Sequence, residues 1–289
     1  MSFYGDAVMP EYWSLDSGLE FTEMSTAIVR VFTSEGFVIA ADGRARIQET
    51  ETVVSDSEQK LFIISRSDRA LVYSFAGNLQ VINDSTGELV VDVISEIRRA
   101  IQETALAPSR HDLNWYVSKL WKEAHRKLIL ASKSKDSSPF PVSPNDPGVI
   151  CHVFFYGYYR NVPVELDLRF MHEEQTVVKP RFFPTGHLAP GVIMYGSERV
   201  ATLLFRTDDF SFSQYRTPAI QKAIRHQSLT LSDGIEIAES YIHACDSNEG
   251  RAIDPTICAA IGGHIHIAAI TPQEVKWIKS PIRTLGETK

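Results

Sequence analysis

Two short apolar runs joined by a tight turn constrain the fold of this chain more than any other feature. The runs cover residues 28–32 and 37–41, are rich in β-branched side chains, and flank Thr33-Ser34-Glu35-Gly36. Such runs around a turn that contains Gly predict a β-hairpin. Thr26 lies at the start of the first strand, and Asp42 directly follows the second.

Two further apolar runs follow the hairpin and predict two more strands. The first covers residues 61–64 and is preceded by Lys60. The second covers residues 70–75 and ends in Ala76-Gly77. Dense apolar runs of this length are typical of strands that are buried on both faces.

The rest of the chain changes between helical and strand patterns. Apolar residues at helical spacing predict a helix over 85–106, capped by Ser85 and Glu88, and another over 113–131. Further helices are predicted over 197–205, 217–226 and 232–244, and further strands over 149–159, 162–170, 175–183, 191–195, 257–270 and 275–278. Neither a repeat nor a linker interrupts this order, so we expect one domain.

Composition and charge exclude several classes of function. The net charge of -7 and the lack of a Lys/Arg run argue against a nucleic-acid partner. No apolar stretch approaches the ~20 residues that span a bilayer, so no membrane segment is expected. Cys151, Cys245 and Cys258 are widely spaced, which predicts buried, reduced thiols in a cytoplasmic protein. His264 and His266 lack an evident third ligand, so we expect neither a metal nor a cofactor.

Residues 1–25 are expected to be an N-terminal extension or propeptide, and residues 26–289 one domain. The segment carries acidic and aromatic side chains and no Lys or Arg, so it is not a secretory signal. Three interpretations stay open. It is a removable leader, a structural extension over the mouth of the active site, or the result of a start placed too far upstream, with Met24 the true start.

The chain carries, in this order, Thr26, Gly36, Ala40-Ala41-Asp42-Gly43-Arg44, Lys60 and Ala76-Gly77. This series resembles the N-terminal part of a 20S proteasome β subunit, which is an N-terminal-nucleophile (Ntn) hydrolase. The motif resemblance is confined to about residues 26–77, and the order of elements is similar over about 26–280. The resemblance implies an α+β fold, namely a four-layer αββα sandwich.

The alternation of side chains along the first strand supports Thr26 as its first residue. In strands of this family, apolar residues at odd offsets from the Thr pack against helices. Counted from Thr26, Val29 and Val31 lie on that face and Arg30 points away. Counted from Ser25, Arg30 would enter the core, and a buried unpaired Arg is costly.

The resemblance also implies a threonine-type peptidase. The Thr26 hydroxyl would be the nucleophile and the Thr26 α-amine its base. Lys60 would lower the pKa of that amine, Asp42 would hold Lys60, and the Gly77 N–H would stabilise the oxyanion. The substrate would be a peptide or unfolded polypeptide inside a ring of like subunits, with an ATP-dependent unfoldase as a further partner.

Several positions depart from the family pattern. Ser25 precedes Thr26 where the family has Gly, and Tyr195 occupies the position of a supporting Ser. Ile261 and Cys258 replace a Ser and an Asp before Gly262-Gly263, although Asp254 lies just upstream. Two alternatives therefore stay open: a non-catalytic structural subunit of such an assembly, and an Ntn amidohydrolase that acts on small amides.

Overall fold

The predicted hairpin lies in the middle of a six-stranded sheet in the computed structural model, which describes residues 19–23, 26–46, 52–77, 80–82, 89–105, 115, 118–120, 122–127, 149–171, 191–206 and 210–281. The strand order is β1-β12-β2-β3-β13-β14. These strands are β1 (Leu19–Glu23), β12 (Gly191–Gly196), β2 (Ile28–Phe32), β3 (Phe37–Ala41), β13 (His266–Ile270) and β14 (Val275–Lys279). The sheet is mixed, because β1 pairs with β12 in parallel and the other pairs are antiparallel.

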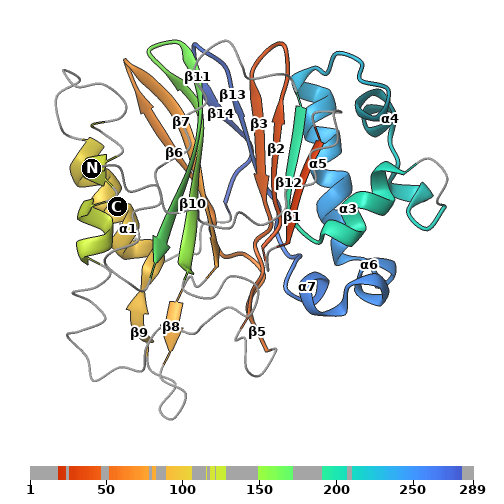
Figure 1. Ribbon diagram of the computed structural model, residues 1–289, viewed down its shortest axis with the longest axis horizontal. Coiled ribbons are helices and arrows are strands. Elements are labelled where there is room, and N and C mark those ends of the chain that lie inside the picture. Colours follow the sequence, from red (N-terminus) through yellow and green to blue (C-terminus); the bar gives the residue numbers. More distant parts are fainter. Residues whose placement is uncertain are drawn as a thin grey trace, which may run out of the picture.

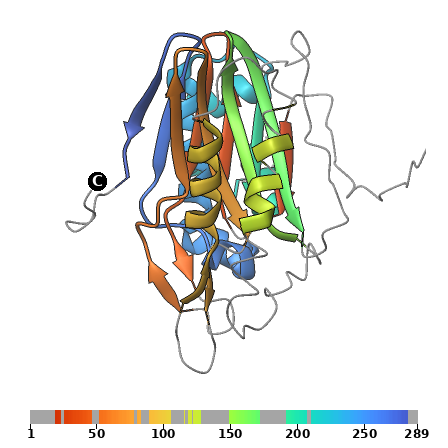
Figure 2. The same cartoon turned by 90° about the vertical axis from the view of Figure 1, so that its left-hand side faces the viewer.

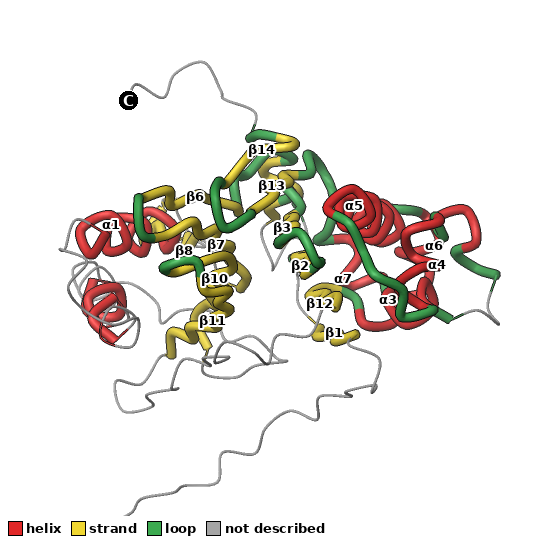
Figure 3. The backbone as a smooth tube through the Cα atoms, turned by 90° about the horizontal axis from the view of Figure 1, so that it is seen from above, coloured by secondary structure: helices red, strands yellow, loops and turns green. Residues whose placement is uncertain are grey.

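A four-stranded antiparallel sheet packs against one face of this sheet (Figures 1 and 3). Its order is β11-β10-β7-β6. The strands are β6 (Leu61–Arg66), β7 (Arg69–Gly77), β10 (Val149–Tyr159) and β11 (Val162–Met171). Arg160 and Asn161 form the turn between β10 and β11, and their positive φ angles of 51° and 60° suit a two-residue hairpin.

The helices of the C-terminal half cover the other face of the six-stranded sheet (Figure 1). They are α3 (Glu198–Phe205), η1 (Ser213–Tyr215), α4 (Pro218–Ile224), α5 (Leu231–Asp246), α6 (Asn248–Ile253) and α7 (Pro255–Ala259). On the outer face of the four-stranded sheet, α1 (Val93–Ala105) packs over the strands and runs roughly along them (Figure 2). Part of the second predicted helix is helical as well, at residues 118–120 and 122–127. Among the described residues, no helix combines the length and apolar composition that crossing a membrane requires.

The α+β class is correct, but the predicted four-layer αββα sandwich is not confirmed. The described strands form four sheets rather than two, because β4 (Ala45–Arg46) pairs with β5 (Val53–Ser55) and β8 (Gln80–Ile82) pairs with β9 (Leu89–Asp92) as separate hairpins. Both hairpins project from the same end of the molecule (Figures 1 and 2). On the outer face of the four-stranded sheet, α1 is the one complete helix among the described residues. These residues therefore do not establish a second helical layer.

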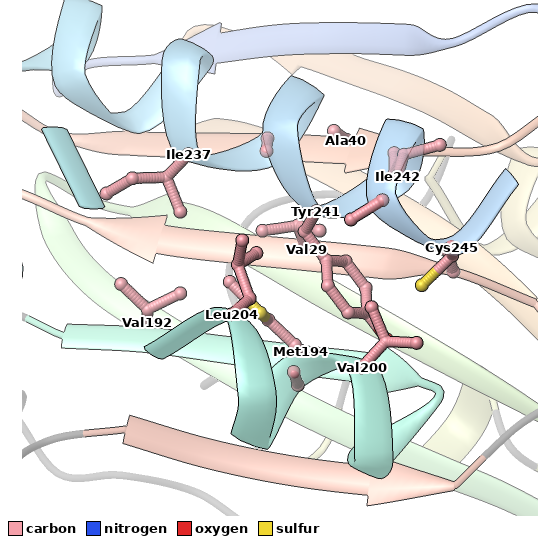
Figure 4. Packing of buried hydrophobic residues seen from close by; sticks show 14 of the residues in the cluster. Val29, Ala40, Val192, Met194, Val200, Leu204, Ile237, Tyr241, Ile242 and Cys245 are labelled. Carbon is pink, nitrogen blue, oxygen red and sulfur yellow. The ribbon is translucent and has the colours of Figure 1, made fainter. Parts of the chain in front are cut away.

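Apolar residues hold these parts together, and the predicted facing of β2 is confirmed. Val29 and Val31 belong to a buried cluster between the six-stranded sheet and the helices (Figure 4). Arg30 points the other way and is buried between the sheets, where its Nη2 lies 2.7 Å from Oε2 of Glu165 on β11. The pairing explains how the chain tolerates a buried Arg there, since an unpaired charge would be costly.

Three predicted elements are wrong at their ends. The strand over 257–270 begins only at His266, because Asp254 caps α7 and Pro255 occupies its first turn. The helix over 85–106 begins at Val93, where the Asp92 carboxylate accepts from the Ser95 N–H at 2.9 Å. Helix α5 begins at Leu231, capped by Thr230 rather than Ser232. Ser85, Glu88 and residues 175–183 lie outside the described residues.

Candidate functional site

A buried ion pair joins the two larger sheets at one end. Asp42 directly follows β3 and Lys60 directly precedes β6. The Lys60 Nζ lies 3.1 Å from each oxygen of the Asp42 carboxylate, and both side chains are at most 1% exposed. A charge pair removed from water to this extent persists only where the geometry satisfies both partners.

Three backbone N–H groups complete the surroundings of the Asp42 carboxylate. Oδ1 accepts from the Ala27 N–H at 2.9 Å, and Oδ2 accepts from the N–H groups of Arg44 at 3.1 Å and Gly262 at 3.2 Å. Burial raises the pKa of Asp42, and Lys60 together with the backbone donors opposes that rise. The donors fix the position of the carboxylate, which in turn fixes the Lys60 ammonium.

Thr26 lies beside this pair. The Ala27 N–H donates to Asp42, and the Asp42 N–H donates back to the Ala27 carbonyl at 3.1 Å. These two bonds hold the residue next to Thr26 against the carboxylate. Thr26 itself is buried and lies just before β2.

Gly77 ends β7 at the same end of the four-stranded sheet. The Phe75 N–H donates to the Lys60 carbonyl at 3.2 Å, so Phe75 lies opposite Lys60 in the sheet. Gly77 follows two residues later on β7. Its φ of +99° favours glycine, and a Cβ here would lie 3.1 Å from both the Cys151 Cα and the Ile150 carbonyl oxygen. Gly77 is exposed, so its main chain is open to a ligand. The structure thus places all four predicted residues at one end of the two sheets.

A hydrogen bond between Ser197 and Asp254 borders the site, and the sequence did not reveal it. The Ser197 Oγ donates to the Asp254 Oδ2 at 2.6 Å, and both residues are buried. Ser197 caps α3 and Asp254 caps α7, so the bond joins two helix starts. A Cβ on the preceding Gly196 would lie 3.4 Å from the Ala27 Cα, which places this pair beside the start of β2. The only sequence signal is that both residues occupy cap positions.

Replacing Ser197 by Ala is expected to lower the free energy of unfolding by about 1–3 kcal/mol. The change removes the cap of α3 and leaves a buried Asp254 oxygen without its donor. Urea unfolding measures the loss. Ser232→Ala is the matched control, because Ser232 is exposed on α5, and it should change stability by less than about 0.5 kcal/mol. Equal losses in the two variants would contradict this interpretation.

The loop with Ile261 supports the site through its main chain rather than through a hydroxyl. The Gly262 N–H reaches Asp42, as described above, and Arg44 Nη1 donates to the Ile261 carbonyl at 2.9 Å. The same nitrogen donates to Asp246 at 2.9 Å, and the Arg44 Nε donates to Asp56 at 2.7 Å. Arg44 therefore connects β3, the end of α5 and the loop that carries Gly262.

Tyr195 fills space between the two sheets. Its ring centroid lies 4.3 Å from that of Phe154 on β10, and Tyr195 pairs with Ile28 in the sheet. Burial raises the pKa of Tyr195 well above its usual value, so the phenol stays neutral. An aromatic ring here packs the interior beside the start of β2, a role that a Ser at this position does not have.

His266 is a buried histidine near the Lys60–Asp42 pair. It opens β13 and is 0% exposed, and neither ring nitrogen has a hydrogen-bond partner among the described residues. Its ring centroid lies 5.0 Å from that of His264, which sits in the preceding loop. Burial, followed by the effects of His264 and Lys60, lowers the pKa of His266 from 6.5 to about 4. Among the described residues, no three His, Cys, Asp or Glu side chains gather as metal ligands would.

The lowered pKa predicts a specific acid sensitivity. Because the unfolded His titrates at 6.5 and the folded one at about 4, the unfolded chain binds more protons between these values. The stabilising effect of neutral His266 is complete above about pH 6.5 and is lost as pH falls toward 4, with a total of about 3 kcal/mol.

Urea unfolding between about pH 7 and about pH 4.5 tests this expectation. His266→Leu should lose stability less steeply on acidification than the unchanged protein. His243→Gln, at an exposed position on α5, should follow the unchanged protein. Identical pH profiles for His266→Leu and the unchanged protein would show that His266 titrates normally.

Comparisons with known proteins identify structural neighbours but no family. No family model matches the chain, and no curated protein matches it. The structure is similar to that of Anbu from Pseudomonas aeruginosa, solved as a helical assembly, with a TM-score of 0.50, 13% identity, and coverage of 88% of this chain and 87% of that chain. Anbu from Yersinia bercovieri, described as an ancestral beta-subunit, has a TM-score of 0.48, 15% identity, and coverage of 88% and 87%. A Gly-1 mutant of Anbu from Hyphomicrobium sp. strain MC1 gives the same four values.

These neighbours correct the family expectation. The Pseudomonas structure, with a TM-score of 0.50, is an Anbu protein rather than a 20S proteasome β subunit of the type that the motifs resemble. At 13% identity, the likeness to the Pseudomonas protein concerns the fold alone. The motif from Thr26 to Gly77 covers only a short part of the chain. A match over so short a part indicated 20S proteasome β subunits specifically, whereas the comparisons with solved structures identify only a shared fold.

Proposed function

We propose that this chain is a threonine-type endopeptidase subunit that acts through Thr26 as an N-terminal nucleophile. The observation that carries the proposal is the buried Lys60–Asp42 pair, whose carboxylate also binds the N–H next to Thr26. A fixed cation therefore lies near the start of β2. A Thr hydroxyl is a weak nucleophile that needs such help together with a nearby base.

The proposed reaction uses four residues. The Thr26 α-amine takes the proton of the Thr26 hydroxyl, and the Oγ1 attacks the peptide carbonyl carbon. The Gly77 N–H donates to the oxygen that becomes negative. The amine then gives the proton to the leaving nitrogen, and water hydrolyses the Thr26 ester. Lys60 keeps the amine neutral near pH ~7–8 by like-charge repulsion, and Asp42 holds Lys60.

This chemistry requires that Thr26 become the first residue. In the full sequence, the Thr26 nitrogen forms a peptide bond with Ser25. We propose that residues 1–25 are a propeptide and that residues 26–289 form the domain of the active protein. Within the propeptide, β1 pairs with β12 from Leu19↔Val192 to Glu23↔Gly196, which brings the chain to the site shortly before Thr26.

We also propose that the subunit assembles with copies of itself into a ring in the cytoplasm. The Pseudomonas neighbour was solved as a helical assembly. From this neighbour we take the assembly of like subunits as support for the proposal. An enclosed chamber would restrict substrates to peptides and unfolded polypeptides, which an ATP-dependent unfoldase would deliver. The net charge of -7 argues against nucleic acid as a partner.

A second candidate is a non-catalytic structural subunit. The observation that favours it is β1, which pairs with β12 in the six-stranded sheet and ends at Glu23, only three residues before Thr26. Removal of residues 1–25 would take this edge strand from the sheet. If the strand stays attached, the Thr26 nitrogen remains in a peptide bond and the amine base is absent. Tyr195 and Ile261 favour this candidate too, because they replace the Ser hydroxyls of the family pattern.

Hydrolysis assays distinguish these candidates and the small-amide alternative. The purified protein is incubated with an unfolded polypeptide, a set of short peptides and a set of simple acyl amides. Cleavage of the polypeptide and peptides supports the proposal, whereas cleavage of the acyl amides alone supports an amidohydrolase. No cleavage of any substrate, with residues 1–25 still attached, supports the structural subunit.

A further inference from the structure

The Lys60–Asp42 pair has a neighbour on the side away from β2. In the six-stranded sheet, Ala41 pairs with Ile28 on one side and with His266 on the other. Asp42 follows Ala41 directly, so the pair lies between the start of β2 and the start of β13. His266 therefore begins β13 on the side of Ala41 opposite the start of β2, and Lys60 lies close enough to disfavour its charged form.

His266 faces the interior between the two larger sheets, on the same side of β13 as Ala268 and Ile270. Val72 and Ala76 of β7 belong to the apolar cluster there, Val275 and Trp277 of β14 pack against it, and the buried Ser74 Oγ of β7 has no hydrogen-bond partner among the described residues. The charged or titratable groups that affect the ring are His264 in the preceding loop and Lys60 directly before β6, and Lys60 is paired with Asp42 directly after β3. A ring whose two nitrogens are buried without partners among the described residues costs stability, which calls for a functional explanation.

We propose that His266 is a positioning residue for Lys60, an inference that rests on the proposed function. The neutral ring closes the side of the pair away from Thr26 and keeps the Lys60 ammonium on Asp42. A protonated ring would place a second cation beside Lys60 and compete for the Asp42 carboxylate. The same arrangement accounts for the low pKa of His266, because both burial and Lys60 disfavour its charged form.

A titration that needs no enzymatic activity tests the coupling. Proton NMR of the full chain follows the histidine ring signals, with His266 assigned from the loss of its signal in His266→Gln. The His266 pKa should be about 4 in the unchanged protein. It should rise in Lys60→Met, since a like charge has been removed, and fall in Asp42→Asn. Lys276→Met, at an exposed position on β14, should leave it unchanged.

Titration of His266 near 6.5, or the same pKa with and without Lys60, would overturn the proposal. Asp42→Asn keeps the test decisive if Lys60→Met does not fold, because the two variants predict shifts of opposite sign. This result is independent of whether the protein cleaves peptides, so it separates failure of this inference from failure of the proposed function.

Kinetics then separate positioning from a merely structural role. His266→Gln should lower kcat about tenfold with little change in KM, because Lys60 acts on the chemical step rather than on binding. In a Lys60→Met background the same replacement should have little further effect, since its target is already absent. Equal losses in both backgrounds would mean that His266 acts independently of Lys60.

Discussion

Replacing Thr26 by Ala is expected to abolish peptide hydrolysis, with a loss in kcat of at least about 10³-fold. The change removes the hydroxyl that forms the covalent intermediate and leaves the rest of the site in place. Hydrolysis of a fluorogenic peptide by the purified native protein measures the effect. The loss should appear in kcat rather than in KM, because the hydroxyl acts in the chemical step.

Two controls make this result specific. Thr26→Ser keeps a hydroxyl and should retain measurable activity. Thr256→Ala, at an exposed position of α7, should behave as the unchanged protein. Activity that survives in Thr26→Ala would remove Thr26 as the nucleophile.

The second large effect concerns stability. Replacing Lys60 by Met should lower the free energy of unfolding by about 3–5 kcal/mol, because it leaves the buried Asp42 carboxylate without its cation. Urea unfolding near neutral pH measures the loss. The double variant Lys60→Met with Asp42→Asn should recover part of it, since no uncompensated buried charge remains.

An exposed ion pair gives the matched control. Lys279 Nζ lies 2.5 Å from Glu239 Oε1, but their side chains are 42% and 30% exposed. Lys279→Met should therefore cost less than about 1 kcal/mol. A loss for Lys60→Met as small as that for Lys279→Met would show that Asp42 does not depend on Lys60.

Local patterns predicted the parts of the fold that depend on neighbouring residues. The hairpin formed by β2 and β3, and the facing of Val29, Val31 and Arg30, follow from alternation along short runs. The helices predicted over 197–205 and 217–226 are found as α3 and α4, whose caps bond to residues only three positions away. These signals are contained in the segments themselves.

Contacts between distant segments could not be predicted in this way. Ser197 and Asp254 are 57 positions apart, and Gly262 lies 220 positions from the carboxylate that it binds. The run at 257–270 predicts one strand because its apolar residues suit a strand as well as a short helix, and the Asp254 cap and Pro255 decide in favour of the helix. The four candidate site residues were named through a family resemblance, and their roles remain proposals.

The N-terminus of the purified native protein decides whether the proposed mechanism can operate. Intact mass spectrometry combined with N-terminal sequencing shows which residue comes first. A chain that begins at Thr26 is the predicted result, because it supplies the free amine that the proposed mechanism requires. A chain that retains residues 1–25 in an assembled, homogeneous preparation would contradict the peptidase mechanism and favour the structural subunit.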